Sequence, residues 1–373
     1  MSIVIFIVIL LVLVLVHEAG HFFVAKKFGI RVDEFGFGFP PKLFGIKKGE
    51  TEYTFNLLPL GGFVKIFGES PDEESMNGPD AERSFINKSK WKQALVLFAG
   101  VFMNFVLAWV LFSFGFISGL PASVGGETAG YEISNINLVV TSVLPDSPAH
   151  DAGLKVGDKI TSVSLPASSN SVNTLENPNT ESFKEFIVSK GAKATEKVPM
   201  SISYIRSGEE NTVSIVPIKS TEKGPTIGIS MDMIGTAKLP IFKAFWAGLS
   251  LTASVTKDTT LGLFKLIGDA VVGKGDLTTV TGPVGMVGIV GDAYEFGFVY
   301  LLSFAALISV NLGIINLFPF PALDGGRLFF LLIEKIKGSR INPKFANAAN
   351  MIGFIILISL MLVITYHDVA KLL

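Results

Sequence analysis

The sequence contains no cysteine, and this absence excludes several kinds of chemistry. Disulfide bonds, thiol nucleophiles and cysteine-ligated metals all require that residue. Charged residues are also scarce, at 17% of 373 residues, where a soluble domain is usually about a quarter charged. Together with 49% hydrophobic residues and a mean hydropathy of +0.53, this composition predicts a membrane protein.

Histidine is scarce as well, because the chain has only His17, His21, His150 and His367. The number of possible metal ligands is therefore small. Neither the net charge of −1 nor any basic cluster indicates a nucleic acid partner. The N-terminus has no basic segment before its apolar run and no small-residue cleavage site after it, so we expect a retained transmembrane helix there.

The most informative motif is His17-Glu18-Ala19-Gly20-His21, which directly follows an unbroken apolar run over residues 3–16. H-E-x-x-H on a helix places two imidazoles at i and i+4 on one face. Both can bind one zinc ion, and Glu18 can reach a water on that metal. The alternative is a pair of boundary histidines beside a snorkelling glutamate, although polar groups in an apolar span are costly and typically functional.

Four segments are long and apolar enough to span a bilayer, namely residues 3–25, 95–120, 298–318 and 346–366. Basic residues follow the first, precede the second and separate the last two. All three groups fall on one side, which the positive-inside rule assigns to the cytoplasm. Both termini and an outer region, residues 121–300, then lie outside, and His17 and His21 lie toward the cytoplasmic end of the first span.

Two histidines leave a catalytic zinc ion one protein ligand short, since such sites use three ligands and a water. His150 and His367 lie on the opposite side in this topology, so a carboxylate is needed. Asp324 follows the third span at the same depth as the histidines. Pro319, Pro321 and the glycines after Asp324 would unwind the helix and let the carboxylate turn inward. The alternative is an Asp-Gly turn that only ends the helix.

Residues 32–67 contain Gly36-Phe37-Gly38 and two partly alternating apolar runs, a pattern that predicts β-hairpins. Such hairpins either dip into the membrane against protein surface or pack on the helices from the cytoplasm. Residues 69–82 are acidic and polar, and we expect an exposed loop.

Within the outer region, residues 139–219 read as a small mixed domain, with a helix at 181–190 and strands at 199–206 and 212–217 joined by a Ser207-Gly208 turn. Its S-P-A-x-x-A-G-L-x-x-G-D-x-I pattern over residues 147–160 resembles a bacterial PDZ domain, and the length has room for one. The Ser/Asn-rich residues 167–180 suggest a surface insertion. Residues 239–274 could be a fifth span, but Lys257-Asp258 interrupt them, so we prefer interfacial amphipathic helices on the outer leaflet.

The motifs H-E-A-G-H, G-F-G and N-x-x-P-x-P-x-L-D-G-G (residues 316–326), with the PDZ-like pattern, together resemble the site-2 protease family. The similarity is greatest to the bacterial RseP-type intramembrane metalloproteases. This resemblance implies Zn2+ bound by His17, His21 and Asp324, with Glu18 as the general base. It also implies that substrate is bound by Asn316, Gly36, Gly38, Pro319 and Pro321.

Two features depart from the family pattern. Well-known relatives carry tandem PDZ domains, whereas one is expected here. Val101 also replaces the proline of the G-P-x-x-N motif in the second span, which leaves the role of Asn104 open.

We therefore expect a polytopic α-helical membrane protein with about four transmembrane helices, membrane-associated β-hairpins and an inserted α+β PDZ domain. The expected parts, in chain order, are a first transmembrane helix (1–30), cytoplasmic-side hairpins and acidic loop (31–94), a second transmembrane helix (95–120), an extracytoplasmic PDZ-like domain with linkers (121–238), an interfacial amphipathic region (239–297), a third transmembrane helix with the L-D-G motif (298–326), and a basic loop with the fourth transmembrane helix (327–373).

The function that this implies is a zinc-dependent intramembrane endopeptidase of a bacterial inner (plasma) membrane. Its expected partners are membrane lipid, single-span substrates of the anti-sigma factor or remnant signal peptide type, and an upstream site-1-type protease that trims them. A non-catalytic PDZ adaptor with structural zinc is the alternative, but zinc ligation alone would not need Glu18. A zinc transporter would need several ligand sites along a pathway, and the histidines form only one cluster.

Overall fold

The computed structural model of the protein describes all residues except 71, 126–130, 166–173, 192–198, 207, 221–223, 275–280 and 371–373. The chain forms two compact units. Unit 1 consists of Met1–Phe114, Phe245–Gly291 and Leu302–Leu373, and unit 2 consists of Gly115–Ala244 and Asp292–Leu301.

Four helices are long and apolar enough to cross a membrane: α1 (Ser2–Lys27), α3 (Lys90–Ser118), α8 (Phe298–Leu317) and α10 (Pro343–Ala370). Each coincides with one predicted span to within a few residues. The prediction of about four transmembrane helices is thereby confirmed for the described part of the chain.

Helix α3 packs closely against two of the other spans. A Cβ atom on Gly20 of α1 would lie 2.4 Å from the carbonyl oxygen of Ala99, so only glycine permits this approach. On the α8 side, the hydroxyl of Ser309 donates to the carbonyl oxygen of Asn104 at 2.8 Å. Small residues and interhelical hydrogen bonds are the usual means by which membrane helices associate.

Strands β1 (Val32–Lys48) and β2 (Thr51–Ile66) form one long antiparallel hairpin, where the sequence suggested several. The strands are joined at Gly49, whose φ of +67° favours glycine. Strand β2 lies against α1, because a Cβ on Gly62 would be 3.3 Å from the Leu15 side chain. Phe44 and Ile46 are exposed near the tip, which fits a hairpin that enters the membrane; that location stays a prediction.

Two segments expected to be loops contain helices. Residues 69–82 include the short helix α2 (Glu73–Asn77), whose N-terminus has a capping box formed by Asp72 and Ser75. Two short 3-10 helices, η1 (Ala81–Arg83) and η2 (Phe85–Asn87), follow it. The basic loop after the third span contains α9 (Asp324–Lys337), which ends at Gly338 with φ +74°. The sequence did not predict this helix, because a glycine pair stands at its start and several basic residues follow that pair.

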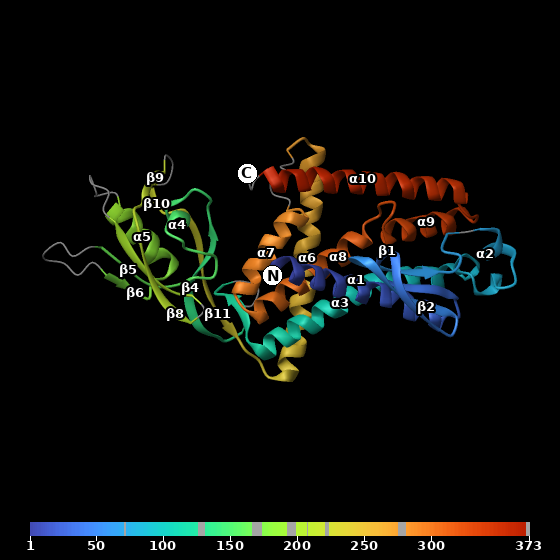
Figure 1. The fold of residues 1–373 in the computed structure, drawn as a ribbon, viewed down its shortest axis with the longest axis horizontal. Coiled ribbons are helices and arrows are strands. Elements are labelled where there is room, and N and C mark those ends of the chain that lie inside the picture. The colour runs from blue at the N-terminus through green and yellow to red at the C-terminus, as the bar shows by residue number, and fades with distance from the viewer. Residues whose placement is uncertain are drawn as a thin grey trace. The chain divides into compact units, whose positions relative to one another are not determined.

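Helices α6 (Ile241–Val271) and α7 (Pro283–Glu295) follow β11 (Ile229–Ala237) in the chain. Helix α6 is not one of the four candidate spans. Figure 1 shows it running across the direction of α3 and α10 rather than along it. Its Phe245 packs on Trp109 of α3, with ring centroids 4.4 Å apart. This arrangement fits an interfacial helix, and the interfacial location stays a prediction.

Unit 2 is built on a seven-stranded sheet with the order β3-β11-β4-β5-β7-β8, in which β6 also pairs with β5. The predicted helix and strands in this region are confirmed as α5, β7 and β8, whereas Ser207 and residues 167–173 of the expected 167–180 insertion lie outside the described residues. The elements of the region are β3 (Leu120–Ser123), β4 (Ile133–Val143), α4 (Pro148–Asp151), β5 (Lys159–Ser164), β6 (Thr174–Glu176), α5 (Thr180–Gly191), β7 (Met200–Arg206), β8 (Glu209–Ile215), β9 (Ile218–Ser220), β10 (Gly224–Thr226) and β11 (Ile229–Ala237).

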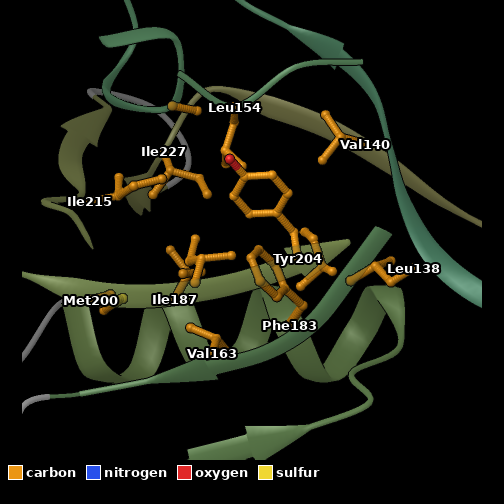
Figure 2. Close-up of a cluster of buried hydrophobic side chains, with 13 residues drawn as sticks. Leu138, Val140, Leu154, Val163, Phe183, Ile187, Met200, Tyr204, Ile215 and Ile227 are labelled. Atoms are coloured by element: carbon orange, nitrogen blue, oxygen red, sulfur yellow. The ribbon is translucent and has the colours of Figure 1, made fainter. Parts of the chain in front are cut away.

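The core of unit 2 lies between α5 and the sheet. Phe183 and Ile187 are four residues apart on one face of α5, and Figure 2 shows them among the side chains of Val163, Met200 and Tyr204. All five side chains are buried. Burying each one contributes roughly 1.5–3 kcal/mol, so this cluster is the main source of stability of the domain.

An ion pair with a buried carboxylate and a partly exposed guanidinium lies at the edge of this core. Asp158 is fully buried, and Arg206 donates to both of its carboxylate oxygens at 2.7 Å. The backbone N–H of Lys155 donates to the same carboxylate at 2.8 Å. This two-pronged pairing compensates the carboxylate for its loss of water.

We predict that Arg206→Ala lowers the stability of unit 2 by about 2–3 kcal/mol, because it leaves a buried charge without its main partner. Hydrogen exchange of the full-length protein, read at amides of β5 and β7, would measure this effect. Lys184→Ala, which removes an exposed cation of α5, is the control and should leave exchange unchanged. Equal protection in both variants would show that the pair does not stabilise the domain.

Candidate metal centre

Helix α1 places His17, Glu18 and His21 in its C-terminal half. Their i and i+4 spacing brings the two imidazoles together, with ring centroids 4.8 Å apart and the rings nearly perpendicular. Both histidines are buried, at 6% exposure each, although they belong to a helix that is otherwise apolar up to this point. Burial of two such rings needs compensating partners.

Asp324 reaches the histidines because the chain turns sharply after α8. Helix α8 ends at Leu317, and α9 begins at Asp324, with Pro319 and Pro321 between them. A Cβ on Gly325 would lie 2.2 Å from the carbonyl oxygen of Leu317. The glycine pair therefore lets the first turn of α9 lie directly against the end of α8.

Three side-chain atoms converge at one point. Nε2 of His17 and Nε2 of His21 lie 3.0 and 3.3 Å from Oδ2 of Asp324, and the two nitrogens are 3.2 Å apart. Ligands at about 2.0–2.1 Å from a tetrahedral zinc ion are separated by about 3.3 Å, so these spacings match one face of a zinc site. Within the described residues, this is the one group of three metal-binding side chains, and Oδ2 of Asp324 is buried without a hydrogen-bond donor. The donor set therefore fits zinc.

The other ring nitrogens are also engaged, which fixes the orientation of both imidazoles. Nδ1 of His21 donates to the carbonyl oxygen of Val96 at 2.8 Å. Nδ1 of His17 lies 3.1 Å from the side-chain amide of Asn104. The Oδ1 atom of that amide is buried and unpartnered in the described part of the chain. Rotating the amide group by 180° exchanges its oxygen and nitrogen, and Oδ1 can then accept a hydrogen bond from Nδ1 of His17. These contacts direct Nε2 of both rings toward the point that they share with Asp324, as outer contacts do for histidines that bind a metal.

Asn104 and Gly100 are the residues that sequence reasoning left open or missed. Asn104 is fully buried in α3, and its polarity within an apolar span was the available signal. A Cβ on Gly100 would lie 2.3 Å from Nε2 of His21, so the missing side chain makes room for the ring. Nothing in the sequence pairs Gly100 with a residue so far from it along the chain.

Glu18 lies beside the three converging atoms. Its carboxylate accepts a hydrogen bond from the backbone N–H of Val64 in β2, and it is within electrostatic range of Asp324 and Glu69. Arg327 forms an ion pair with Glu69. The attraction of Glu69, followed by that of Asp324 and Glu18, raises the pKa of Arg327 despite its burial. A permanent cation thus offsets three neighbouring carboxylates.

The remaining predicted residues lie outside the converging group. A Cβ on Gly36 would meet the Phe63 ring at 2.3 Å, so Gly36 is required by the hairpin itself. Gly38 has φ +75°, and a Cβ there would be 2.6 Å from the carbonyl oxygen of Leu58. Asn316 is half-buried in the last turn of α8 and makes no side-chain hydrogen bond to a described residue.

The two prolines differ in their surroundings. Pro319 is exposed, whereas the carbonyl group of Pro321 closely approaches Gly353 of α10. A Cβ on Gly353 would lie 2.5 Å from that oxygen. Pro321 therefore helps to hold the turn that delivers Asp324.

Comparison with known proteins finds similarity over almost the whole chain. The profile of Peptidase family M50 matches residues 5–360. A protein of Clostridium perfringens (strain 13 / Type A) is 36% identical over 358 residues, which cover 96% of this chain and 95% of that protein. The zinc metalloprotease RasP of Geobacillus kaustophilus (strain HTA426) is 29% identical over 444 residues, covering 99% of this chain and 98% of that protein. The regulator of sigma-W protease RasP of Bacillus subtilis (strain 168) is 31% identical over 451 residues, covering 100% of this chain and 99% of that protein.

We predict that Gly100→Ala lowers the zinc content of the purified protein. The new methyl group would displace the ring of His21, and a shifted ligand should weaken metal binding by about 10–100-fold. Elemental analysis after dialysis against a weak chelator would measure the loss. Gly268→Ala is the matched control, because a Cβ on that helical glycine of α6 meets nothing within 4 Å. Equal zinc content in both variants would contradict the packing argument.

Proposed function

The chain belongs to peptidase family M50, and from this assignment we propose that it cuts single-span membrane proteins inside the bilayer. It is an integral membrane protein and a zinc metalloprotease. The observation that carries the proposal is the convergence of His17, His21 and Asp324 at the buried end of a spanning helix. A metal site at that depth serves a substrate that is itself in the membrane.

In this proposal His17, His21 and Asp324 are the protein ligands of zinc, and Glu18 is the general base. Zinc held there would activate a water molecule and polarise the scissile carbonyl group. One oxygen of Glu18 accepts the Val64 N–H, which leaves the second oxygen to take a proton from the water. The same oxygen can then deliver the proton to the nitrogen of the leaving amine.

A helical substrate hides its carbonyl groups in i→i−4 hydrogen bonds, so it must be extended locally before it can be cut. Strand β2 is well placed to assist, because Val64 contacts Glu18 and Gly62 lies against α1. We propose that an edge of the hairpin pairs with the extended segment by β-augmentation. The unpaired amide of Asn316 would hold a freed backbone group. Gly36 and Gly38 contribute by shaping the hairpin, and Pro319 and Pro321 by shaping the turn.

The Bacillus subtilis relative is named a regulator of sigma-W protease. By analogy, we propose an anti-sigma factor as substrate, trimmed first by a protease acting on the outer side; clearance of remnant signal peptides is the second candidate. The three basic groups support a cytoplasmic location for the metal centre, in a bacterial plasma membrane with both termini outside.

Unit 2 would then lie outside the membrane, where we propose that it acts as a PDZ-like domain. The S-P-A-x-x-A-G-L-x-x-G-D-x-I pattern supports this reading, since its Ser147 begins α4 and its Asp158 forms the buried ion pair. It would bind a newly exposed C-terminus or exclude bulky substrates. Membership of a peptidase family argues against the alternative of a non-catalytic adaptor with structural zinc.

We predict that Glu18→Gln lowers cleavage of a trimmed single-span substrate at least 100-fold while zinc content is unchanged. Loss of general base catalysis costs roughly 10²–10⁴ in rate, and the amide keeps the shape of the side chain. The assay uses zinc-loaded full-length protein in detergent, with zinc measured in the same samples. Equal cleavage by both proteins would point to a contaminating protease and remove Glu18 from the mechanism.

We also predict that Asn316→Leu slows cleavage about 3–10-fold without loss of zinc, as expected for one lost hydrogen bond to substrate. Asn316→Gln, which keeps the amide, should recover part of the rate. Rates for the three proteins at saturating and limiting substrate would separate binding from turnover. An unchanged rate for Asn316→Leu would exclude a role for this amide.

A further inference from the structure

A groove lies between the first turns of α3 and helix α9. The two helices are antiparallel there, because Glu334 near the end of α9 pairs with Lys90 at the start of α3. The lining is almost entirely apolar, with lysines at the end where that ion pair lies. The lining residues on which the argument rests are Trp91, Leu95 and Phe98 of α3, and Leu328, Leu332 and Lys335 of α9.

The inner wall of the groove is firmly packed, while its opening is not covered by described residues. Leu328 and Leu331 pack against the buried cluster that includes Phe22, the neighbour of His21. Trp91 and Leu332, in contrast, are 57% and 52% exposed. Exposed aromatic and aliphatic side chains at the end of a membrane span are suited to contact with lipid.

Positive charge is in excess at the lysine end. Lys90 is paired with Glu334, but Lys335 has no carboxylate partner among the residues that the structure describes. Lys88 and Lys92 precede and follow Lys90 in the chain. Burial lowers the pKa of Lys88, and repulsion from Lys92 and Arg83 lowers it further.

We propose that this groove binds an anionic phospholipid, with one acyl chain along the apolar wall and the phosphate at Lys335. The positive charge at the lysine end of the groove favours an anionic lipid over a transmembrane substrate as the occupant. Single-span proteins carry basic residues at the cytoplasmic end of the span, and the lysines here would repel them. Anionic headgroups are attracted to such clusters.

A lipid in the groove would affect the metal centre, because the groove is lined by the helix that carries Asp324. Helix α9 carries Asp324 at its first residue and Leu328 and Lys335 along the groove. A lipid held between α3 and α9 would keep α9 docked and so keep Asp324 beside the histidines. The lipid site itself does not depend on the proposed proteolysis.

Native mass spectrometry of the delipidated full-length protein would test the site, with phosphatidylglycerol and phosphatidylcholine of the same acyl chains as probes. We expect one phosphatidylglycerol to bind preferentially, and Lys335→Gln to weaken it about fivefold, as for one lysine at an anionic surface. Lys337→Gln removes a charge of the same helix that does not line the groove, and should bind like the original protein. Equal binding of both lipids, or equal binding by both variants, would overturn the proposal.

A second measurement uses the absence of cysteine from the chain. Leu332→Cys can carry a single fluorescent label at the groove. Nitroxide-bearing phosphatidylglycerol should quench this label more than the phosphatidylcholine analogue in mixed vesicles, and Lys335→Gln should remove the difference. If a single-span substrate peptide displaces the quencher, or if the two lipids quench equally, the groove is not an anionic lipid site.

Discussion

The fold of unit 1 depends on one constraint: two imidazoles and one carboxylate must share a buried point in a bundle of apolar helices. None of these groups is tolerated there singly, because each loses its water without compensation. The structure meets this constraint by close packing, since Gly20 and Gly100 bring α1 and α3 together around the ring of His21. Contacts to Val96 and Asn104 then orient both rings toward Asp324. The site is therefore as much a product of α3, which supplies no ligand, as of α1.

The third member of the cluster, Asp324, lies at the start of α9, after the turn that follows α8, and not within a spanning helix. Two prolines end α8, and Ala322 adopts φ +75° before α9 begins. A positive φ costs an alanine free energy and persists only where its surroundings impose it. Those surroundings include the amide of Asn350, whose oxygen accepts from the N–H of Ala322 at 3.2 Å, and the contact of Pro321 with Gly353. Helix α10 thus holds the turn in place through Asn350 and Gly353.

The sequence was sufficient for the features that rest on local periodicity and composition. Long apolar runs defined the four spans, and the i, i+4 spacing of His17 and His21 fixed one face of a helix. Features that rest on contacts between distant segments were not accessible in this way. The amphipathic helix α9 was taken for a basic loop, because its opening glycines are unfavourable in a helix until they pack against the end of α8. The clearance that Gly100 gives His21 likewise exists only once α1 and α3 are packed.

These observations give the glycines and the charged residues of unit 1 distinct roles. Glycines set how closely the helices approach, whereas charged residues are used where a segment leaves the apolar bundle. Arg327 illustrates the second role, because its pairing with Glu69 joins α9 to the chain just after β2. Val64 near the end of β2 also donates to Glu18, so the hairpin, the proposed general base and the helix that carries Asp324 are linked through a few polar contacts. A shift of the hairpin on substrate binding would move Glu18 through its contact with Val64, and would move α9 through the ion pair of Glu69. Substrate binding at the hairpin could in this way change the geometry of the site.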